Sequence, residues 1–204
     1  MIIKTDDLNQ MEKRYRAQLI NSLSGIKSAN LVGTINKDGQ TNLSIVSSVF
    51  HLGADPALMG MIFRPAVVER HTFENILETK QLTLNHVNSE IFTQAHQTSA
   101  RYPREVSEFE AVGLTEEYKE EIVSPFVKES KIKIGLELVE AKHLEVNKTE
   151  MVIAKIIFVE FDEEILTEDG HIDIMKSDTI GVSGLDHYVS LKSLRRLPYA
   201  KMKV

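Results

Sequence analysis

Residues 31–50 read LVGTINKDGQTNLSIVSSVF, and this stretch decides the fold class. Leu31 and Ile35 are separated by an even number of positions within an alternating pattern, which is typical of a β-strand. Lys37-Asp38-Gly39 is a strong turn signal, and the extended pattern resumes over residues 41–50. The stretch therefore predicts a β-hairpin, in which a short turn joins two antiparallel strands.

Further strands are expected on the C-terminal side of this hairpin. Residues 57–63 are an apolar run, and residues 81–88 alternate between apolar and polar positions. Residues 131–146 and 149–161 are two longer β-rich runs, and Asn147-Lys148 between them predicts a tight hairpin. The last run is apolar at both odd and even positions, so we expect both of its faces to be buried.

Helices are expected around these strands. Residues 6–21 have apolar side chains at helical spacing, and residues 66–79 also have a helical pattern. Residues 89–119 are polar and helical in character, with a break at Pro103. Residues 163–204 contain many turn residues and are expected to be mostly irregular.

The order of these elements favours an antiparallel sheet. Short turns connect the strands more often than helices do, which argues against a doubly wound parallel sheet. We therefore expect a mainly β protein with peripheral helices (α+β), built on a small closed or partly closed antiparallel β-barrel. No linker, repeat or low-complexity segment divides residues 1–204, so one domain is expected.

Composition excludes several functional classes. The chain has 204 residues, with 24 Lys+Arg against 30 Asp+Glu and a formal net charge of −6. No long basic run is present, so we expect no nucleic-acid partner. Cysteine is absent, which excludes disulfides, thiolate nucleophiles and iron–sulfur clusters and is compatible with a reducing cytosol. No secretory signal or long apolar run is visible, so we expect a cytoplasmic protein without a membrane partner.

Common catalytic and metal-binding motifs are also missing. The sequence contains no G-x-G-x-x-G, P-loop, G-x-S-x-G or H-E-x-x-H motif. No two of the seven histidines have the helical i, i+4 spacing of a metal-ligand pair, so we expect no metal site. No residue is assigned a catalytic role from the sequence.

Three clusters of polar residues are candidates for ligand binding. Ser47 and Ser48 lie next to each other in an apolar extended stretch and point to opposite faces, so at least one hydroxyl meets a core or a cleft. Arg64 ends a strand, and Arg70 and Thr72 begin a helix, where a forked cation, a hydroxyl and free N–H groups suit a phosphate. The small polar residues of 97–104 suit a loop that offers backbone groups to a ligand.

Each cluster also has a purely structural interpretation. The serine hydroxyls can bond to neighbouring backbone carbonyls. The start of the helix can be a solvated face with an arginine–glutamate pair, and the loop can be a simple connector between two helices.

The chain resembles the flavin reductase-like proteins with the FMN-binding split β-barrel fold, in the branch that includes flavoredoxin. The resemblance covers about residues 25–190 and depends on an ordered set of stretches. The most specific of these is TSARYPREVSEFE at 98–110, in register with RHTFENI at 70–76. LNHV at 84–87 and DTIGVSGLDHYVSL at 178–191 are further members of the set.

The resemblance implies which residues bind FMN. Strand residues 44–48 run along the flavin ring and the phosphate, residues 70–72 grip the phosphate, and the remaining positions lie near the ring or the ribityl chain. The implied contacts are Ser44, Val46, Ser47, Ser48, Phe63, Arg64, Arg70, His71, Thr72, Asn85, Thr98, Ser99, Ala100 and, beside His187, Tyr188. His71 departs from the family pattern, in which aspartate is common at this position.

The resemblance also implies an activity and an assembly. It implies an oxidoreductase of the flavin reductase type, which passes electrons from NAD(P)H or an electron-transfer protein through FMN to a small acceptor. A flavin performs the redox chemistry itself, so the lack of an acid–base pair is no objection. It also implies a homodimer with FMN near the interface. Two alternatives remain: a non-catalytic FMN-binding carrier, storage or sensor module, and a barrel that has lost its cofactor.

Overall fold

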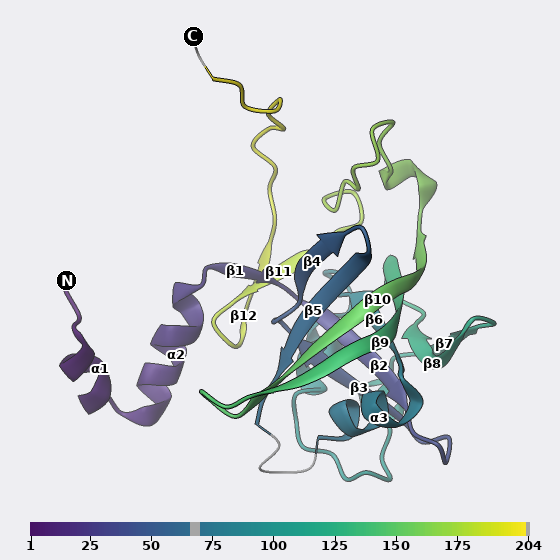
Figure 1. The fold of residues 1–204 in the computed structure, drawn as a ribbon, viewed down its shortest axis with the longest axis horizontal. Helices are drawn as coiled ribbons and strands as arrows, with labels where there is room; N and C mark the ends of the chain where they lie inside the picture. Colours follow the sequence, from purple (N-terminus) through teal and green to yellow (C-terminus); the bar gives the residue numbers. More distant parts are fainter. Residues whose placement is uncertain (66–69, 203–204) are drawn as a thin grey trace.

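A seven-stranded antiparallel sheet forms the centre of the computed structural model, which describes residues 1–65 and 70–202 (Figure 1). Its strand order is β3-β2-β6-β9-β10-β5-β4. These strands are β2 (Asn30–Ile35), β3 (Thr41–Val46), β4 (Phe50–Ala54), β5 (Ala57–Phe63), β6 (Gln81–His86), β9 (Ile132–Leu144) and β10 (Thr149–Phe161). The architecture is mainly β and antiparallel, as the sequence predicted.

Two smaller sheets and short helices surround the central sheet. One small sheet contains β1 (Ile26–Ser28), β11 (Ile180–Ser183) and β12 (His187–Ser190), and the other contains β7 (Glu116–Lys119) and β8 (Ile122–Val127). The helices are α1 (Thr5–Gln10), α2 (Lys13–Leu23), α3 (His71–Thr79), α4 (Phe92–Gln97), α5 (Glu108–Val112) and the 3₁₀ turn η1 (Glu163–Ile165). No helix within the described residues has the length and apolar character needed to cross a membrane.

The hydrophobic core lies on both faces of β2. Leu31 belongs to a cluster with residues of β3, α4, α5 and β11, whereas Val32 belongs to a cluster with residues of β5, β6, β9 and β10. Successive side chains of a strand point to opposite faces, so one strand contributes to both clusters. Burial on both faces fixes the position of β2, and β3 is in turn held by its pairing with β2.

The expected hairpin at residues 31–50 is confirmed. β2 and β3 pair antiparallel from Asn30↔Val46 to Ile35↔Thr41. In the turn, the Asn36 side-chain oxygen accepts hydrogen bonds from the backbone N–H groups of Asp38 (3.0 Å) and Gln40 (2.8 Å). The expected hairpin at Asn147-Lys148 is confirmed as well, between β9 and β10.

Several expected element boundaries were wrong. The single helix expected over 6–21 is two helices, because the Glu12 carboxylate accepts hydrogen bonds from the Arg14 and Tyr15 backbone N–H groups and starts α2 anew. Neither α1 nor α2 has a buried residue, and Figure 1 shows both projecting from the barrel. The helix expected over 66–79 is described from His71 onward as α3, and residues 66–69 lie outside the described residues.

Two longer segments contain strands that were not expected. The region 89–119 is only partly helical, since it contains the short α4 and α5 and ends in the strand β7. The region 163–204 is mostly irregular over its described residues, as expected, but it contains two short strands: β11, which pairs with β1, and β12, which pairs with β11. The pairing of β1 with β11 connects residues more than 150 positions apart, such as Ile26 and Ser183, and local sequence patterns do not reveal it.

β10 is buried on one face only. Val152 and Ala154 are fully buried, whereas Ile157 and Val159 are 38% and 45% exposed. The sequence predicted that both faces of β10 are buried, and within a single chain this prediction was wrong. Leu136, Leu138 and Ile156 of the β9–β10 hairpin pack in the core, whereas the Phe158 ring lies 5.3 Å from that of Phe126 in β8.

Candidate functional site

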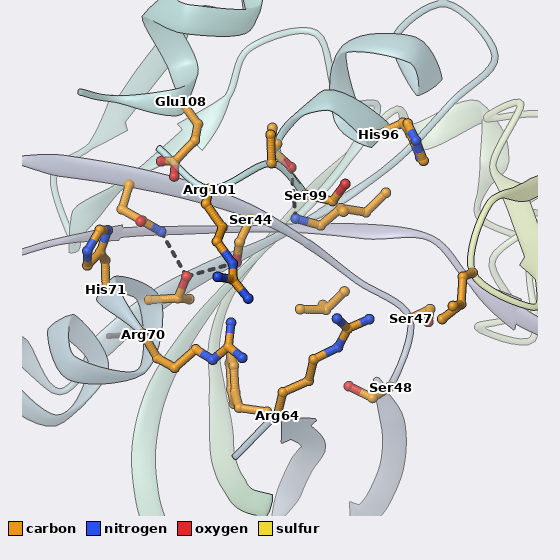
Figure 2. A pocket seen from close by; sticks show the side chains of 18 of the residues that line it. Ser44, Ser47, Ser48, Arg64, Arg70, His71, His96, Ser99, Arg101 and Glu108 are labelled. Atoms are coloured by element: carbon orange, nitrogen blue, oxygen red, sulfur yellow. Dashed lines mark hydrogen bonds between the residues drawn. The ribbon is translucent and has the colours of Figure 1, made fainter. Parts of the chain in front are cut away.

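A cavity of about 610 Å³ opens beside the exposed edge of β3. Its walls come from β3 and the segment after it, the end of β5, the start of α3, the segment after α4, and β12 (Figure 2). The volume lies within the range of pockets that bind cofactors and other small molecules. Among the described residues, no group of three or more His, Asp or Glu side chains is arranged to hold a metal ion.

The cavity brings together thirteen of the fourteen residues that the resemblance implied. They come from five separate parts of the sequence and meet at one place. These residues are Ser44, Val46, Ser47, Ser48, Phe63, Arg64, Arg70, His71, Thr72, Thr98, Ser99, Ala100 and Tyr188.

Asn85 does not line the cavity. It is completely buried in β6, where its amide nitrogen donates to the Leu31 carbonyl (3.2 Å) and to the Thr83 hydroxyl (3.0 Å). Its side-chain oxygen accepts a hydrogen bond from the Val127 backbone N–H (3.0 Å). β6 lies inside the sheet between β2 and β9, so this side chain stabilises the interior of the barrel, and its expected place near the ligand is corrected.

Thr72 connects the start of α3 to β3. Its hydroxyl accepts a hydrogen bond from the Asn42 amide nitrogen (2.8 Å) and lies 2.8 Å from the Ser44 hydroxyl. Figure 2 draws both interactions as dashed lines. Thr72 is 7% exposed, so it acts mainly by holding Asn42 and Ser44 in position on the cavity wall.

Side chains also occupy the outer edge of β3. The backbone N–H of Leu43 donates to the Glu108 carboxylate, and that of Ile45 donates to the Thr98 hydroxyl, both at 2.9 Å. Thr98 in turn donates to the Ala95 carbonyl (2.8 Å), which links β3 to α4. Burial raises the pKa of Glu108, although the hydrogen bond from Leu43 opposes this effect.

The two neighbouring serines behave differently. The Ser48 hydroxyl donates to the Ile62 carbonyl (2.7 Å) and accepts from the Ile62 backbone N–H (3.2 Å), so it anchors the segment after β3 to β5. This is the backbone-bonding alternative considered from the sequence. The Ser47 hydroxyl has no hydrogen-bond partner among the described residues.

Three arginines provide the positive charge of the cavity. Figure 2 shows the guanidinium groups of Arg64, Arg70 and Arg101 converging on its centre. Burial lowers the pKa of Arg70, and the charges of Arg64 and Arg101 lower it further. The buried Nε atom of Arg70 has no hydrogen-bond partner within the described part of the chain. Burying a hydrogen-bond donor without a partner costs free energy. The Arg70 guanidinium is therefore suited to bind an anion.

An aromatic group closes the other end of the cavity. The Tyr188 hydroxyl lies 3.0 Å from His96 Nδ1, and the two rings meet edge to face with centroids 5.7 Å apart. The Phe92 ring lies 5.6 Å from that of Tyr188. Burial raises the pKa of Tyr188, and the charge of Asp186 adds to the effect, so the hydroxyl keeps its proton at neutral pH.

Several lining residues were not among the predicted site residues. These are chiefly Asn42, His96, Arg101 and Glu108. Arg101 and Glu108 lie within the TSARYPREVSEFE stretch, so that motif already contained the signal for both. His96 is a single histidine on a short polar helix, and nothing in the sequence distinguishes it from the others.

The sequence of this chain matches a known protein family. The family description "flavin reductase like domain" matches residues 25–175. The chain belongs to the flavin reductase-like family. Membership places this flavin reductase-like protein among the flavin-related oxidoreductases.

Solved structures agree with this assignment. A split-barrel protein from Shewanella frigidimarina NCIMB 400, provisionally named a flavin reductase, is 56% identical and has a TM-score of 0.95, with coverage of 98% of this chain and 100% of that chain. The likeness confirms the predicted split β-barrel.

Two more distant structures share the fold. Nitrilotriacetate monooxygenase component B from Bacillus cereus is 21% identical with a TM-score of 0.84, with coverage of 97% of this chain and 98% of that chain. Flavoredoxin from Desulfovibrio vulgaris (Miyazaki F) is 22% identical with a TM-score of 0.74, with coverage of 86% and 92%.

Proposed function

We propose that this flavin reductase-like protein is an FMN-dependent oxidoreductase. It passes electrons from a reduced nicotinamide or an electron-transfer protein to a small acceptor. The observation that carries the proposal is the buried Nε of Arg70, which has no hydrogen-bond partner among residues 1–65 and 70–202 and lies in a cavity lined by hydroxyl groups. A phosphate group matches this environment, because guanidinium groups bind it through strong charge-assisted hydrogen bonds.

The residues around the cavity have separable roles in this proposal. Arg70 and Arg101 would hold the phosphate, with Thr72 fixing the wall beside them. The segment Ser44–Ser48 would lie along the ring, where Val46 and Phe63 offer apolar contact. When bound, FMN supplies the redox chemistry, since its ring takes up a hydride and releases electrons to an acceptor. Val46, Phe63 and the segment Ser44–Ser48 would orient the ring in the cavity.

A homodimer also forms part of the proposal. The β9–β10 hairpin exposes Val139 (58%), Ile157 (38%) and Val159 (45%), the first two where the pairing of the two strands is irregular. Exposed apolar patches are typical of protein interfaces. A second copy of the chain placed against this hairpin would cover these side chains, and burial of both faces of β10 would then hold in the dimer.

The first experiment is an absorption spectrum of the purified protein after addition of FMN and desalting. We expect oxidised-flavin bands that NADH or NADPH bleaches in the absence of air. Riboflavin, which lacks the phosphate, is the matched control and should be retained much less. Bands that persist with both nicotinamides would favour an electron-transfer protein as donor or the non-catalytic carrier. A colourless protein that binds no FMN in titration would contradict the proposal.

A further inference from the structure

The cavity holds more positive charge than one flavin phosphate requires. Arg64, Arg70 and Arg101 each carry one positive charge at neutral pH. No carboxylate among the described residues forms an ion pair with any of the three. A phosphate monoester carries about −1.5 to −2 charges at pH 7, which is less than the three positive charges of these guanidinium groups. Glu108 also lines the cavity, and its carboxylate accepts a hydrogen bond from the Leu43 backbone N–H.

Arg64 and Arg70 are held by different elements of the fold. Arg70 is the N-cap residue of α3, directly before the helix that holds β3 through Thr72. Arg64 follows the end of β5, two residues after Ile62, whose backbone is bonded to Ser48. Figure 2 shows the Arg64 guanidinium between that of Arg70 and the Ser47–Ser48 segment. Arg64 therefore lies toward the part of the cavity assigned to the flavin ring.

Exposure separates Arg64 from Arg70 as well. Arg64 is exposed, whereas Arg70 is partly buried and has a buried Nε atom. An exposed guanidinium at the mouth of a cavity can meet a ligand that arrives after the cofactor. The charge of Arg64 also lowers the pKa of Arg70, so the two cations repel each other until anions separate them.

From these observations we infer that Arg64 forms a second anion subsite, which binds an oxyanion group of the second substrate beside the flavin. The inference rests on the proposed function. Two sources share this chemistry: the phosphates of a nicotinamide dinucleotide and the carboxylate of a small acceptor. A guanidinium binds either group through two parallel hydrogen bonds. The residue would position the second substrate against the flavin ring.

The test measures equilibrium binding on the full chain loaded with FMN. NAD⁺, NADP⁺ and benzoate do not reduce flavin, and each is titrated while the flavin absorbance or fluorescence is followed. Arg64→Gln should weaken the binding of at least one of these ligands about ten-fold or more, while FMN affinity is unchanged within error. Arg64→Lys keeps the charge but loses the forked geometry, so it should give an intermediate loss.

Two further variants make the result specific. Arg101→Gln should weaken FMN binding and leave the affinity of the FMN-loaded protein for the second ligand unchanged. Arg195→Gln replaces an exposed arginine outside the cavity and should change neither affinity. Because Arg64 is exposed and has no internal partner among the described residues, its replacement leaves the fold intact, which thermal unfolding will check.

The pattern of losses identifies the source of the oxyanion. Equal losses for NAD⁺ and NADP⁺ support recognition of the shared pyrophosphate, a loss for NADP⁺ alone supports its additional phosphate, and a loss for benzoate supports a carboxylate substrate. The inference is overturned if Arg64→Gln lowers FMN affinity as much as Arg70→Gln does and leaves the second ligand unaffected. It is also overturned if none of the three ligands binds to the FMN-loaded protein. Failure of the unchanged protein to bind FMN at all would overturn the proposed function and the inference together.

Discussion

At the scale of single residues, Arg70 is the side chain on which FMN binding should depend most. Replacement by Ala removes the guanidinium whose Nε has no partner within the described chain. Loss of a charge-assisted hydrogen bond to the phosphate should weaken FMN binding by about 10- to 100-fold. Fluorescence titration with FMN measures the effect, and riboflavin should show almost no difference between the two proteins.

The matched control is Arg195→Ala, which removes an exposed arginine that does not line the cavity. Its FMN affinity should equal that of the unchanged protein. An Arg70→Ala protein that binds FMN as tightly as Arg195→Ala would show that the phosphate lies elsewhere.

Thr72 offers a second test at this scale, because its hydroxyl is a partner for two side chains of β3. Thr72→Val keeps the shape but leaves the Asn42 amide without its acceptor. A buried donor without a partner should lower the free energy of unfolding by about 1–3 kcal/mol. Urea denaturation measures this, and Thr72→Ser, which retains the hydroxyl, should lose less. Equal stability of the Val and Ser variants would show that these hydrogen bonds contribute nothing.

At the scale of elements, the edge of β3 depends on the carboxylate of Glu108. Glu108→Ala leaves the buried Leu43 N–H without its acceptor and should destabilise the protein by about 1–3 kcal/mol. Glu108→Gln retains a side-chain oxygen and removes a charge that burial disfavours, so it should cost much less at neutral pH. Thermal unfolding of both variants distinguishes the two effects, and a Gln variant as unstable as the Ala variant would contradict this role.

The β9–β10 hairpin allows a test of the proposed dimer. Ile157→Lys places a charge among the exposed apolar side chains of this hairpin and should convert a dimer into a monomer. Val123→Lys makes the same kind of change at an exposed position of β8 and should leave the dimer intact. Sedimentation velocity at several protein concentrations gives the mass of each variant. An Ile157→Lys protein that remains dimeric would place the interface on another surface.

At the scale of the whole molecule, stability should depend on pH through His86. Burial lowers the pKa of this histidine from its usual 6.5 to about 4 in the folded protein. Its Nδ1 lies 3.3 Å from the Thr179 hydroxyl, and its backbone carbonyl accepts from the Ser130 hydroxyl. Between pH 6.5 and 4 the unfolded chain therefore binds a proton that the folded chain does not.

The stability of the folded protein should accordingly fall as the pH falls through this window, by a total on the order of 3 kcal/mol. Urea unfolding at a series of pH values measures the slope. His86→Gln removes the titrating group and should flatten the curve between pH 6.5 and 4. An identical slope in the two proteins would assign the effect to other groups.

The central hairpin and most of the cavity lining could be predicted from the sequence. Turn chemistry at Lys37-Asp38-Gly39 is local and predicts the hairpin, and residues of the motif stretches at 70–76 and 98–110 line the cavity. The pairing of β1 with β11 was missed because it is set by contacts between distant segments. Asn85 was misplaced because a strand pattern does not show which neighbours its side chain meets. The burial of β10 was overestimated because the sequence shows which side chains are apolar but not which elements cover them.

The hydrogen bonds from Leu43 and Ile45 along β3 have a consequence beyond the cavity. β3 is the last strand at one side of the seven-stranded sheet, and such a strand usually offers free N–H groups to any passing chain. Here two of these donors are already bonded to Glu108 and Thr98. The contacts that shape the ligand-binding wall thus also block the addition of another strand to β3. They reduce edge-to-edge aggregation through this strand at high protein concentration.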